Sequence, residues 1–245
     1  MAGTVLILGA TSAIARGAAC AFARRGYALY LAARDLPELE RIAADLAIRY
    51  GVAVRYGAFD AEAYASHKTF LDGVVHEMGG LTGVLLASGY MGDSMAARNF
   101  ESGSRVIAIN FTGAASILGL CADYLEKVGS GFIIGISSVA GDRGRQSNYV
   151  YGAAKGALSL FLQGLRNRLF PAGIRVITVK PGFVDTAMTF GLPGLFLMAS
   201  PADVGGRIVN SLESRADIVY VPWFWRYIML IIRSIPESLF KRLRL

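Results

Sequence analysis

Cysteine is scarce in this chain of 245 residues, which contains only Cys20 and Cys121. Both lie in helical patterns and lack companions suited to metal binding, so we expect buried free thiols of a reducing compartment rather than a disulfide framework. The N-terminus lacks a basic stretch before its short apolar run, and no export signal is visible there. These absences indicate a cytoplasmic protein without a metal centre.

Charged residues are scarce as well, at 18% of the chain against 54% hydrophobic residues. A chain of this composition with no long polar tract is not extensively disordered. No linker, internal repeat or shift of composition divides it, and its length suits one α/β domain with a large core. We therefore expect a single domain over residues 1–245.

The net charge of +7 is not gathered into a nucleic-acid-binding pattern, because the arginines are spread along the chain without a recognised motif. We interpret the charge as a solvated surface and expect no nucleic-acid partner. Charge is distributed less evenly at the end of the chain. Residues 218–245 hold five basic residues against one acid, a local net charge of +4 (five minus one): Arg226, Arg233, Lys241, Arg242 and Arg244 against Glu237.

Short β-rich runs alternate with longer helical patterns along the chain. The runs are almost continuously apolar, as expected for parallel strands that helices cover on both faces. The predicted strands are residues 5–8, 28–32, 52–56, 83–87, 131–136, 175–179 and 218–221. This alternation predicts an α/β fold with a Rossmann-type, doubly wound parallel sheet of about seven strands.

The first predicted strand runs into a turn of small residues, Gly9-Ala10-Thr11-Ser12-Ala13-Ile14-Ala15, that opens a helix. The unpaired N–H groups of such a helix start suit a pyrophosphate, and small residues permit its close approach. Only Gly9 is glycine; Ala13 and Ala15 stand where a dinucleotide fingerprint places its other glycines. By itself the turn fits a tight, alanine-packed connection equally well.

The end of the second predicted strand indicates the cofactor preference. An acid there binds the adenosine ribose 2′-hydroxyl, whereas a base binds a 2′-phosphate. We align Ala33 with the acidic position, so Arg34 follows directly, and its guanidinium suits phosphate. NADP(H) is therefore favoured. If the alignment is shifted by one residue, Asp35 takes the acidic position and binds the ribose, and Arg34 is an ordinary surface arginine. NAD(H) is therefore the alternative cofactor.

The fifth predicted strand delivers Ser138 at its carboxyl end, where open parallel sheets bind ligands. The next helix carries Tyr151 and Lys155, whose i,i+4 spacing places them on one face, so the ammonium can stabilise a phenolate and lower the phenol pKa. Tyr151 is then a usable acid/base, with Ser138 as a hydrogen-bond donor to a carbonyl oxygen. Tyr149 lacks a lysine four residues later and is the weaker candidate.

These motifs, in this order over residues 4–215, resemble the short-chain dehydrogenase/reductase family. The resemblance implies a catalytic set of Ser138, Tyr151 and Lys155, with Asn110 holding a proton-relay water and Lys155 also binding the nicotinamide ribose. It further implies a homodimer or homotetramer. The cofactor-binding residues expected are Gly9, Thr11, Ser12, Ala13, Ile14, Arg34, Asp60, Ala61, Ala87, Tyr151, Lys155, Pro181, Gly182, Val184 and Thr186.

The chain departs from the family pattern in its alanine-substituted turn and in Leu86-Ala87-Ser88-Gly89, where the family has Asn-Asn-Ala-Gly. The asparagines normally brace the central sheet. With Val139-Ala140-Gly141 and the Phe183 turn, these departures resemble a subgroup similar to the reductase partner of decaprenylphosphoryl-ribose 2′-epimerase. That resemblance implies a keto sugar linked to a polyprenyl phosphate as substrate.

Two segments are strongly apolar. Residues 187–198 fit a lid for a hydrophobic substrate, or else a helix packed on its own domain or on another subunit. Residues 222–245 form an extension that mixes aromatic, aliphatic and basic residues; it is too short to span a bilayer but suits an interfacial helix on anionic lipid. Burial against the domain or a subunit is the alternative for this extension.

The sequence thus predicts an NADP(H)-preferring oxidoreductase that interconverts a carbonyl and a secondary alcohol on a small-molecule, hydrophobic or lipid-linked substrate. The alternative from another class is a dinucleotide-binding regulatory or scaffold protein, attached to a membrane or a complex by its tail.

Overall fold

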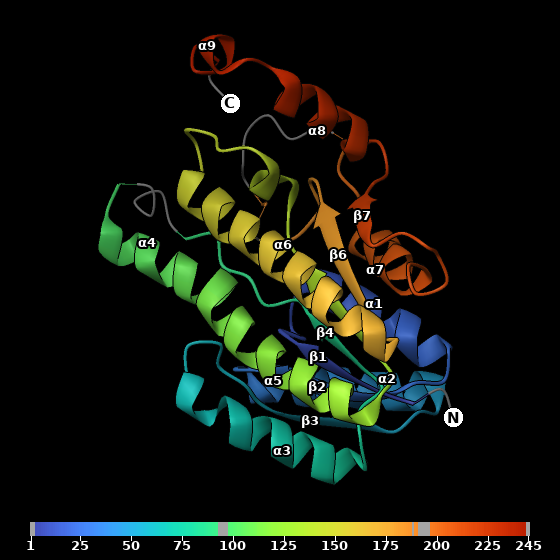
Figure 1. Ribbon diagram of the computed structural model, residues 1–245. Helices are drawn as coiled ribbons and strands as arrows, with labels where there is room; N and C mark the ends of the chain where they lie inside the picture. Colours follow the sequence, from blue (N-terminus) through green and yellow to red (C-terminus); the bar gives the residue numbers. More distant parts are fainter. Residues whose placement is uncertain (1–2, 93–97, 188, 191–196, 244–245) are drawn as a thin grey trace.

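The computed structural model describes residues 3–92, 98–187, 189–190 and 197–243. Its centre is a seven-stranded parallel sheet in the order β3-β2-β1-β4-β5-β6-β7 (Figure 1). The strands are β1 (Thr4–Leu8), β2 (Ala28–Ala33), β3 (Val54–Ala58), β4 (Gly83–Leu86), β5 (Phe132–Ile136), β6 (Arg175–Pro181) and β7 (Ile218–Val221). The predicted doubly wound Rossmann-type sheet is confirmed, and all seven predicted strands exist.

The third strand begins two residues later than predicted. The preceding helix ends on Gly51 in a left-handed conformation, and pairing with β2 starts only at Val54, opposite Leu29. The predicted strand of residues 52–56 was therefore placed two residues too early, because the apolar run begins inside the loop that follows the helix. The sixth strand instead runs longer than predicted, through Lys180 to Pro181.

Helices cover both faces of the sheet and bury two cores. One core packs α1 (Ala13–Arg24), α2 (Leu36–Tyr50) and α7 (Pro201–Asn210) on the sheet. The other packs α3 (His67–Met78), α5 (Gly113–Val128) and α6 (Tyr149–Leu169), which run side by side in Figure 1. The order in which strands are added to the sheet reverses between β1 and β4, so the crevice at their carboxyl ends is where such sheets bind ligands.

The helix before β5 is continuous over three segments: α4 (Phe100–Ile107), the π-helical turn η2 (Ala108–Thr112) and α5. By length and composition this span, Phe100–Val128, is apolar enough to cross a membrane, yet half of its most apolar window is buried inside the protein. Core helices pass the same test. Cys121 on this helix is buried, whereas Cys20 on α1 is only partly buried, so the prediction of two buried free thiols holds fully for Cys121 alone.

The C-terminal extension forms α8 (Trp225–Ser234) and the short α9 (Glu237–Phe240), which lie beyond the carboxyl ends of the strands (Figure 1). Trp225 is 2% exposed and Met229 is fully buried, and both pack against Val139. Arg143 fixes the end of α8 by donating to the carbonyl oxygens of Ile232, Arg233 and Ile235 at 3.3, 2.9 and 2.8 Å. One face of the extension is thus built into the protein.

The remaining short helical segments are η1 (Tyr64–Ser66), η3 (Val139–Asp142) and η4 (Phe170–Ala172). The segment η3 matters for the site, because it follows Ser138 directly and carries the residues on which α8 packs. Much of the predicted apolar lid over 187–198, namely Met188 and residues 191–196, lies outside the described residues.

Candidate active site

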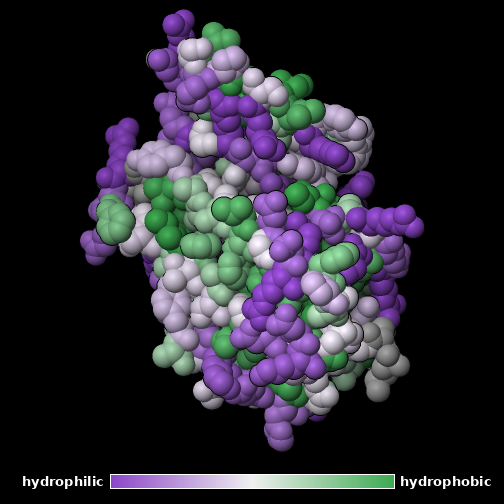
Figure 2. Space-filling view, viewed as in Figure 1, coloured by the Kyte–Doolittle hydropathy of each residue, from purple (hydrophilic) through white to green (hydrophobic). Residues whose placement is uncertain are grey.

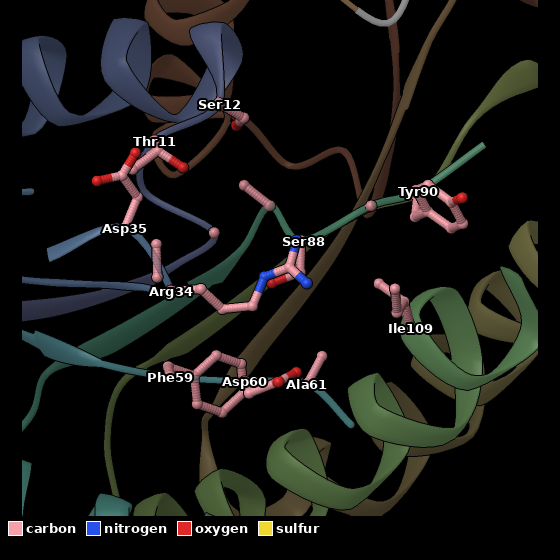
Figure 3. A pocket seen from close by; sticks show the side chains of 14 residues that line it. Thr11, Ser12, Arg34, Asp35, Phe59, Asp60, Ala61, Ser88, Tyr90 and Ile109 are labelled. Atoms are coloured by element: carbon pink, nitrogen blue, oxygen red, sulfur yellow. The ribbon is translucent and has the colours of Figure 1, made fainter. Parts of the chain in front are cut away.

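Two cavities meet at the carboxyl ends of the strands. The first, of about 290 Å³, lies over β2 and β3, and the second, of about 350 Å³, lies over β5 and the start of α6. Both are lined by Ser12, Ala87, Ser88 and Gly89, so they form one groove across the crevice between β1 and β4. Figure 3 shows the first cavity, with Thr11 and Ser12 on one side and Phe59 and Asp60 on the other.

The turn after β1 has the shape needed for a close backbone approach. Gly9 has a φ of +77°, and a Cβ at this position would lie 2.6 Å from the backbone nitrogen of Ser88. Ser12 then caps α1 by accepting a hydrogen bond from the Ala15 nitrogen at 3.2 Å. The start of α1 therefore presents backbone N–H groups to the groove, and the small side chains around it leave room for a phosphate.

Arg34, the residue that favours NADP(H), and Asp35, the residue that would favour NAD(H), differ in their surroundings. The Asp35 carboxylate caps α2, accepting a hydrogen bond from the Glu38 nitrogen at 3.0 Å. Arg34 is exposed and makes no ion pair with any residue of the described ranges. In Figure 3 Arg34 extends across the first cavity toward Ser88, whereas Asp35 lies at its edge beside Thr11.

Ser138, Tyr151 and Lys155 all line the second cavity. Tyr151 and Lys155 share one face of α6, with the Lys155 Nζ 5.9 Å from the centre of the Tyr151 ring. Lys155 is 3% exposed and donates to the Ile136 carbonyl oxygen at 3.0 Å. Ser137 fastens the same turn of α6 to β5 by donating to the Lys155 carbonyl oxygen at 2.8 Å. Tyr151 and Lys155 are therefore held on a helix that is fastened to β5, and Ser138 lies in the short connection between β5 and η3.

The pKa of Tyr151 moves in the direction opposite to the one predicted. Burial raises the pKa of the phenol to about 12, although a hydrogen bond with Ser138 acts to lower it. Burial also lowers the pKa of Lys155 to about 8. The prediction of a lowered phenol pKa considered only the attraction of the ammonium and neglected desolvation, which is the larger effect in this cavity wall.

Asn110 does not line either cavity, although it lies beside them. Fully buried in the π-helical turn η2, its side chain accepts a hydrogen bond from the Tyr90 nitrogen at 3.2 Å and donates to the carbonyl oxygens of Tyr90 and, at 2.8 Å, Val106. Asn110 thus braces the segment after β4, in which the family's two asparagines are missing. Its predicted part in holding a proton-relay water stays a prediction.

Asp60 and Ala61 line the first cavity in a loop that a buried histidine holds. His67 is fully buried, and its ring nitrogens lie 3.0 Å from the Asp60 carbonyl oxygen and 2.9 Å from the Ser116 hydroxyl on α5. The Asp60 carboxylate itself accepts from the Glu62 nitrogen at 3.0 Å. Sequence reasoning missed His67, because a single histidine in a helical pattern carries no signal of its partners.

A buried polar cluster ties together three segments around the second cavity. Lys180 on β6 forms an ion pair with Asp142 of η3, and the Tyr220 hydroxyl of β7 donates to Asp142 at 2.8 Å. Burial and the adjoining Asp142 raise the pKa of Tyr220. Gly182, directly after β6, permits α8 to pack closely because it has no side chain. A Cβ there would lie 1.9 Å from the Trp225 indole nitrogen. The tail is therefore a structural part of the cavity's surroundings.

The structure brings together nearly all of the residues predicted for the site. Those that line one or both cavities are Gly9, Thr11, Ser12, Ala13, Ile14, Arg34, Asp60, Ala61, Ala87, Ser138, Tyr151, Lys155, Pro181, Gly182, Val184 and Thr186. Of the predicted site residues, only Asn110 lines neither cavity. The sequence analysis did not single out Arg145 and Asn148, which also line the second cavity. They precede Tyr151 in a loop with no motif, and only the fold brings that loop to the cavity.

Comparisons with known proteins agree with this geometry. The family model of short chain dehydrogenases matches residues 3–192. An uncharacterized oxidoreductase of Streptomyces coelicolor is 36% identical over 244 residues, covering 98% of this chain and 95% of the relative. Another, of Mycobacterium tuberculosis, is 33% identical over 221 residues, covering 89% and 88%.

Among solved structures, a short-chain dehydrogenase from Sphingobium yanoikuyae in complex with NADPH is 27% identical. It covers 96% of this chain and 97% of its own, with a TM-score of 0.80.

Proposed function

Because this chain belongs to the short-chain dehydrogenase/reductase family and is an NAD(P)-dependent oxidoreductase, we propose that it interconverts a carbonyl and a secondary alcohol with NADP(H) as the preferred cofactor. The observation that carries this proposal is the shared cavity of Ser138, Tyr151 and Lys155, which continues into the groove at the start of α1. The residues of the groove fit a dinucleotide, since Gly9 leaves a cradle that any Cβ would fill.

The cofactor preference rests on the second-strand residues. Asp35 is engaged as the cap of α2, whereas Arg34 is exposed, reaches across the first cavity and has a guanidinium that suits a 2′-phosphate. Start-of-helix N–H groups at Ala13 and Ile14 bind the pyrophosphate, and Lys155 with Thr186 orients the nicotinamide end. The related Sphingobium structure, with NADPH bound, supports the same choice.

The bound nicotinamide supplies the hydride that reduces the carbonyl carbon. Tyr151 donates its proton to the carbonyl oxygen, and Ser138 hydrogen-bonds that oxygen as negative charge develops on it. The Lys155 ammonium stabilises the phenolate that remains on Tyr151. A phenol with a pKa near 12 holds its proton at neutral pH, so the enzyme is in the form that reduction requires.

The substrate is proposed to be hydrophobic or lipid-linked. The second cavity has walls of Val139, Ala140, Phe183 and Val184 close to Tyr151. The exposed face of α8 and the preceding turn adds Trp223, Tyr227, Leu230 and Ile231, each more than half exposed. Exposed basic residues stand among and after them: Arg226, Arg233, Lys241 and Arg242. Aromatic and aliphatic side chains beside basic ones suit the surface of an anionic membrane, so we propose a peripheral contact there.

A comparison of Tyr151→Phe with Tyr149→Phe tests the proposed reaction. Reduction by the wild type is measured with NADPH and NADH over a panel of ketones, and NADPH is expected to be preferred. Tyr151→Phe is expected to lower kcat by about 10²- to 10⁴-fold, the usual contribution of a positioned proton donor. Tyr149, which is 48% exposed on the same helix, is the matched control.

Thermal unfolding with NADPH should show that Tyr151→Phe still binds the cofactor, because ligand binding raises apparent stability. Equal turnover in the wild type and Tyr151→Phe would remove Tyr151 from its assigned role. Cofactor binding with no turnover on any ketone or alcohol would instead favour a dinucleotide-binding regulatory protein.

A further inference from the structure

One guanidinium in the second cavity has no use in the chemistry described so far. Arg145 lines the cavity together with Ser138 and Tyr151, six residues before the latter. Its Nε atom is buried without a hydrogen-bond partner. The only hydrogen bond of its side chain to a described residue runs from Nη2 to the Met229 sulfur at 3.5 Å, and a thioether is a weak acceptor.

No carboxylate of the described residues forms an ion pair with this cation. Asp142 acts on Arg145 only through the field, and both of its oxygens are occupied, one by Lys180 and the other by Tyr220. Burial lowers the pKa of Arg145 against that field. Arg145 as a whole is only partly buried, but a guanidinium partly withdrawn from water without an anionic partner costs free energy. Its retention at a cavity wall therefore favours a partner that arrives with the ligand.

The neighbouring arginine makes the contrast plain. Arg143 donates to three carbonyl oxygens of the tail, pairs with Glu237 at 2.8 Å and lies 4.0 Å from the centre of the Phe240 ring. It is a structural residue whose donors are used. Arg145 holds no such position. Of the other residues that line the second cavity only Lys155 is charged, and Glu237, which lines the third cavity with Arg145, is paired with Arg143.

Asn148 adds a second polar group to the same wall. It occupies the N-cap position of α6, yet its side chain makes no capping hydrogen bond, and its Oδ1 is buried without a partner. The two ends of an amide exchange by rotation about χ2, so Asn148 can offer an N–H to a ligand oxygen. Arg145 also lines a third cavity, of about 280 Å³, between this loop and α9, and so stands at the outer end of the active site.

We propose that Arg145, assisted by Asn148, binds an anionic group of the substrate, a carboxylate or a phosphate, while the carbonyl of the same molecule lies at Ser138 and Tyr151. This inference rests on the proposed reductase function and narrows it to anionic carbonyl compounds. The planar guanidinium fork matches both kinds of oxyanion. It is a binding group for the substrate and not for the adenosine phosphate, because Arg34 stands at the other end of the groove.

Matched pairs of ketones test this site in the full chain. The pairs are 5-oxohexanoate with its methyl ester and dihydroxyacetone phosphate with dihydroxyacetone, each reduced with NADPH. Arg145→Met is expected to lower the ratio of kcat/KM, anionic over neutral, by about 10- to 100-fold for at least one pair, as loss of a charge-assisted hydrogen bond does. Arg145→Lys should restore part of that ratio. Arg215→Met, which removes an exposed positive charge from the loop before β7, is the control and should leave the ratio unchanged.

Binding without turnover separates this inference from the reductase function. In protein saturated with NADP+, dihydroxyacetone phosphate and 5-oxohexanoate should raise the unfolding temperature of the wild type, with at least tenfold weaker binding in Arg145→Met. The pair that responds identifies phosphate or carboxylate as the anion. Equal affinity of the wild type and Arg145→Met for these two anions would overturn the anion site. The site would also be overturned if the affinity of the variant for NADP+ fell by the same factor as its affinity for the anions. Anion binding without any reduction would support it while the reductase function failed.

Discussion

At the scale of single residues, Lys155 is a buried cation whose charge costs stability. Its pKa falls from 10.5 to about 8 because burial disfavours the ammonium. Between those values the unfolded chain binds the proton more strongly than the folded protein, so stability rises with pH across this window. Below pH 8 both states are protonated and the full cost of burial is present.

We therefore expect the free energy of unfolding of the wild type, relative to Lys155→Met, to increase between about pH 8 and 10.5, by on the order of 3 kcal/mol. Chemical denaturation of both proteins over this range measures it. The deprotonation of Tyr151 affects both proteins and largely cancels in the comparison. If the difference in free energy of unfolding between the two proteins stayed constant or decreased with pH, the Lys155 ammonium would not be destabilised by burial.

Residue chemistry explains why most residues predicted for the site line the same two cavities. Gly9, Ser12, Ser138, Tyr151 and Lys155 were each recognised from a strand end or a helix spacing, and such local geometry follows from the backbone alone. The direction of the Tyr151 pKa was missed, since it depends on how much of the protein surrounds the phenol.

At the scale of elements, α8 packs against residues that line the second cavity. Trp225 is 2% exposed and fills the space beside Gly182 and Phe183, while Trp223, two residues earlier, is 61% exposed. Trp225→Ala is expected to destabilise the protein by about 3–5 kcal/mol through the cavity it leaves. Trp223→Ala should change stability by less than about 0.5 kcal/mol, as exposed positions usually do.

Denaturant unfolding of the two tryptophan variants provides the measurement. Comparable losses in both would mean that α8 is not packed on Val139 and Phe183 as the structure has it. The sequence left two alternatives for this segment, burial or membrane contact. The structure shows that one face is buried, and the other face carries the exposed aromatic and basic residues on which the membrane proposal rests.

At the scale of the whole molecule, we propose a homo-oligomer formed through the α4–α5 and α6 face. Figure 2 shows hydrophobic residues gathered where these helices run side by side. Phe100, Ile107 and Leu160 on them are 83%, 37% and 69% exposed. Light scattering is expected to give a multiple of 26.2 kDa. Leu160→Glu should reduce it to the monomer, because a charge buried at an interface is costly.

Ile48→Glu on α2 is the control for that variant, since Ile48 is 84% exposed on the other side of the sheet. A wild type that behaves as a monomer at all accessible concentrations would refute the oligomer. An oligomer that Ile48→Glu but not Leu160→Glu dissociates would place the interface on the opposite face.

The tail provides the second prediction for the whole molecule. The full chain is expected to bind vesicles that contain phosphatidylserine and to bind phosphatidylcholine vesicles far less. Neutralising Arg226 and Lys241 together should weaken that binding by about 30-fold, since each basic residue near an anionic surface contributes about 1 kcal/mol. Neutralising Lys68 on α3 and Lys127 on α5 instead is the control. Vesicle flotation measures both, and equal binding by the two double variants would contradict a tail-directed contact.

The amino-acid sequence sufficed to predict the α/β class, the seven strands of the sheet apart from the bounds of β3 and the end of β6, and most of the residues that line the groove. These are consequences of apolar runs, helix spacing and the rule that parallel strands open at their carboxyl ends. The packed structure was needed to show that Asn110 braces the segment after β4, that Arg143 and Trp225 fix the tail, and that Arg145 lines the second cavity. Those contacts join residues distant in sequence or loops without a motif. Their partners follow from packing, which no local pattern encodes.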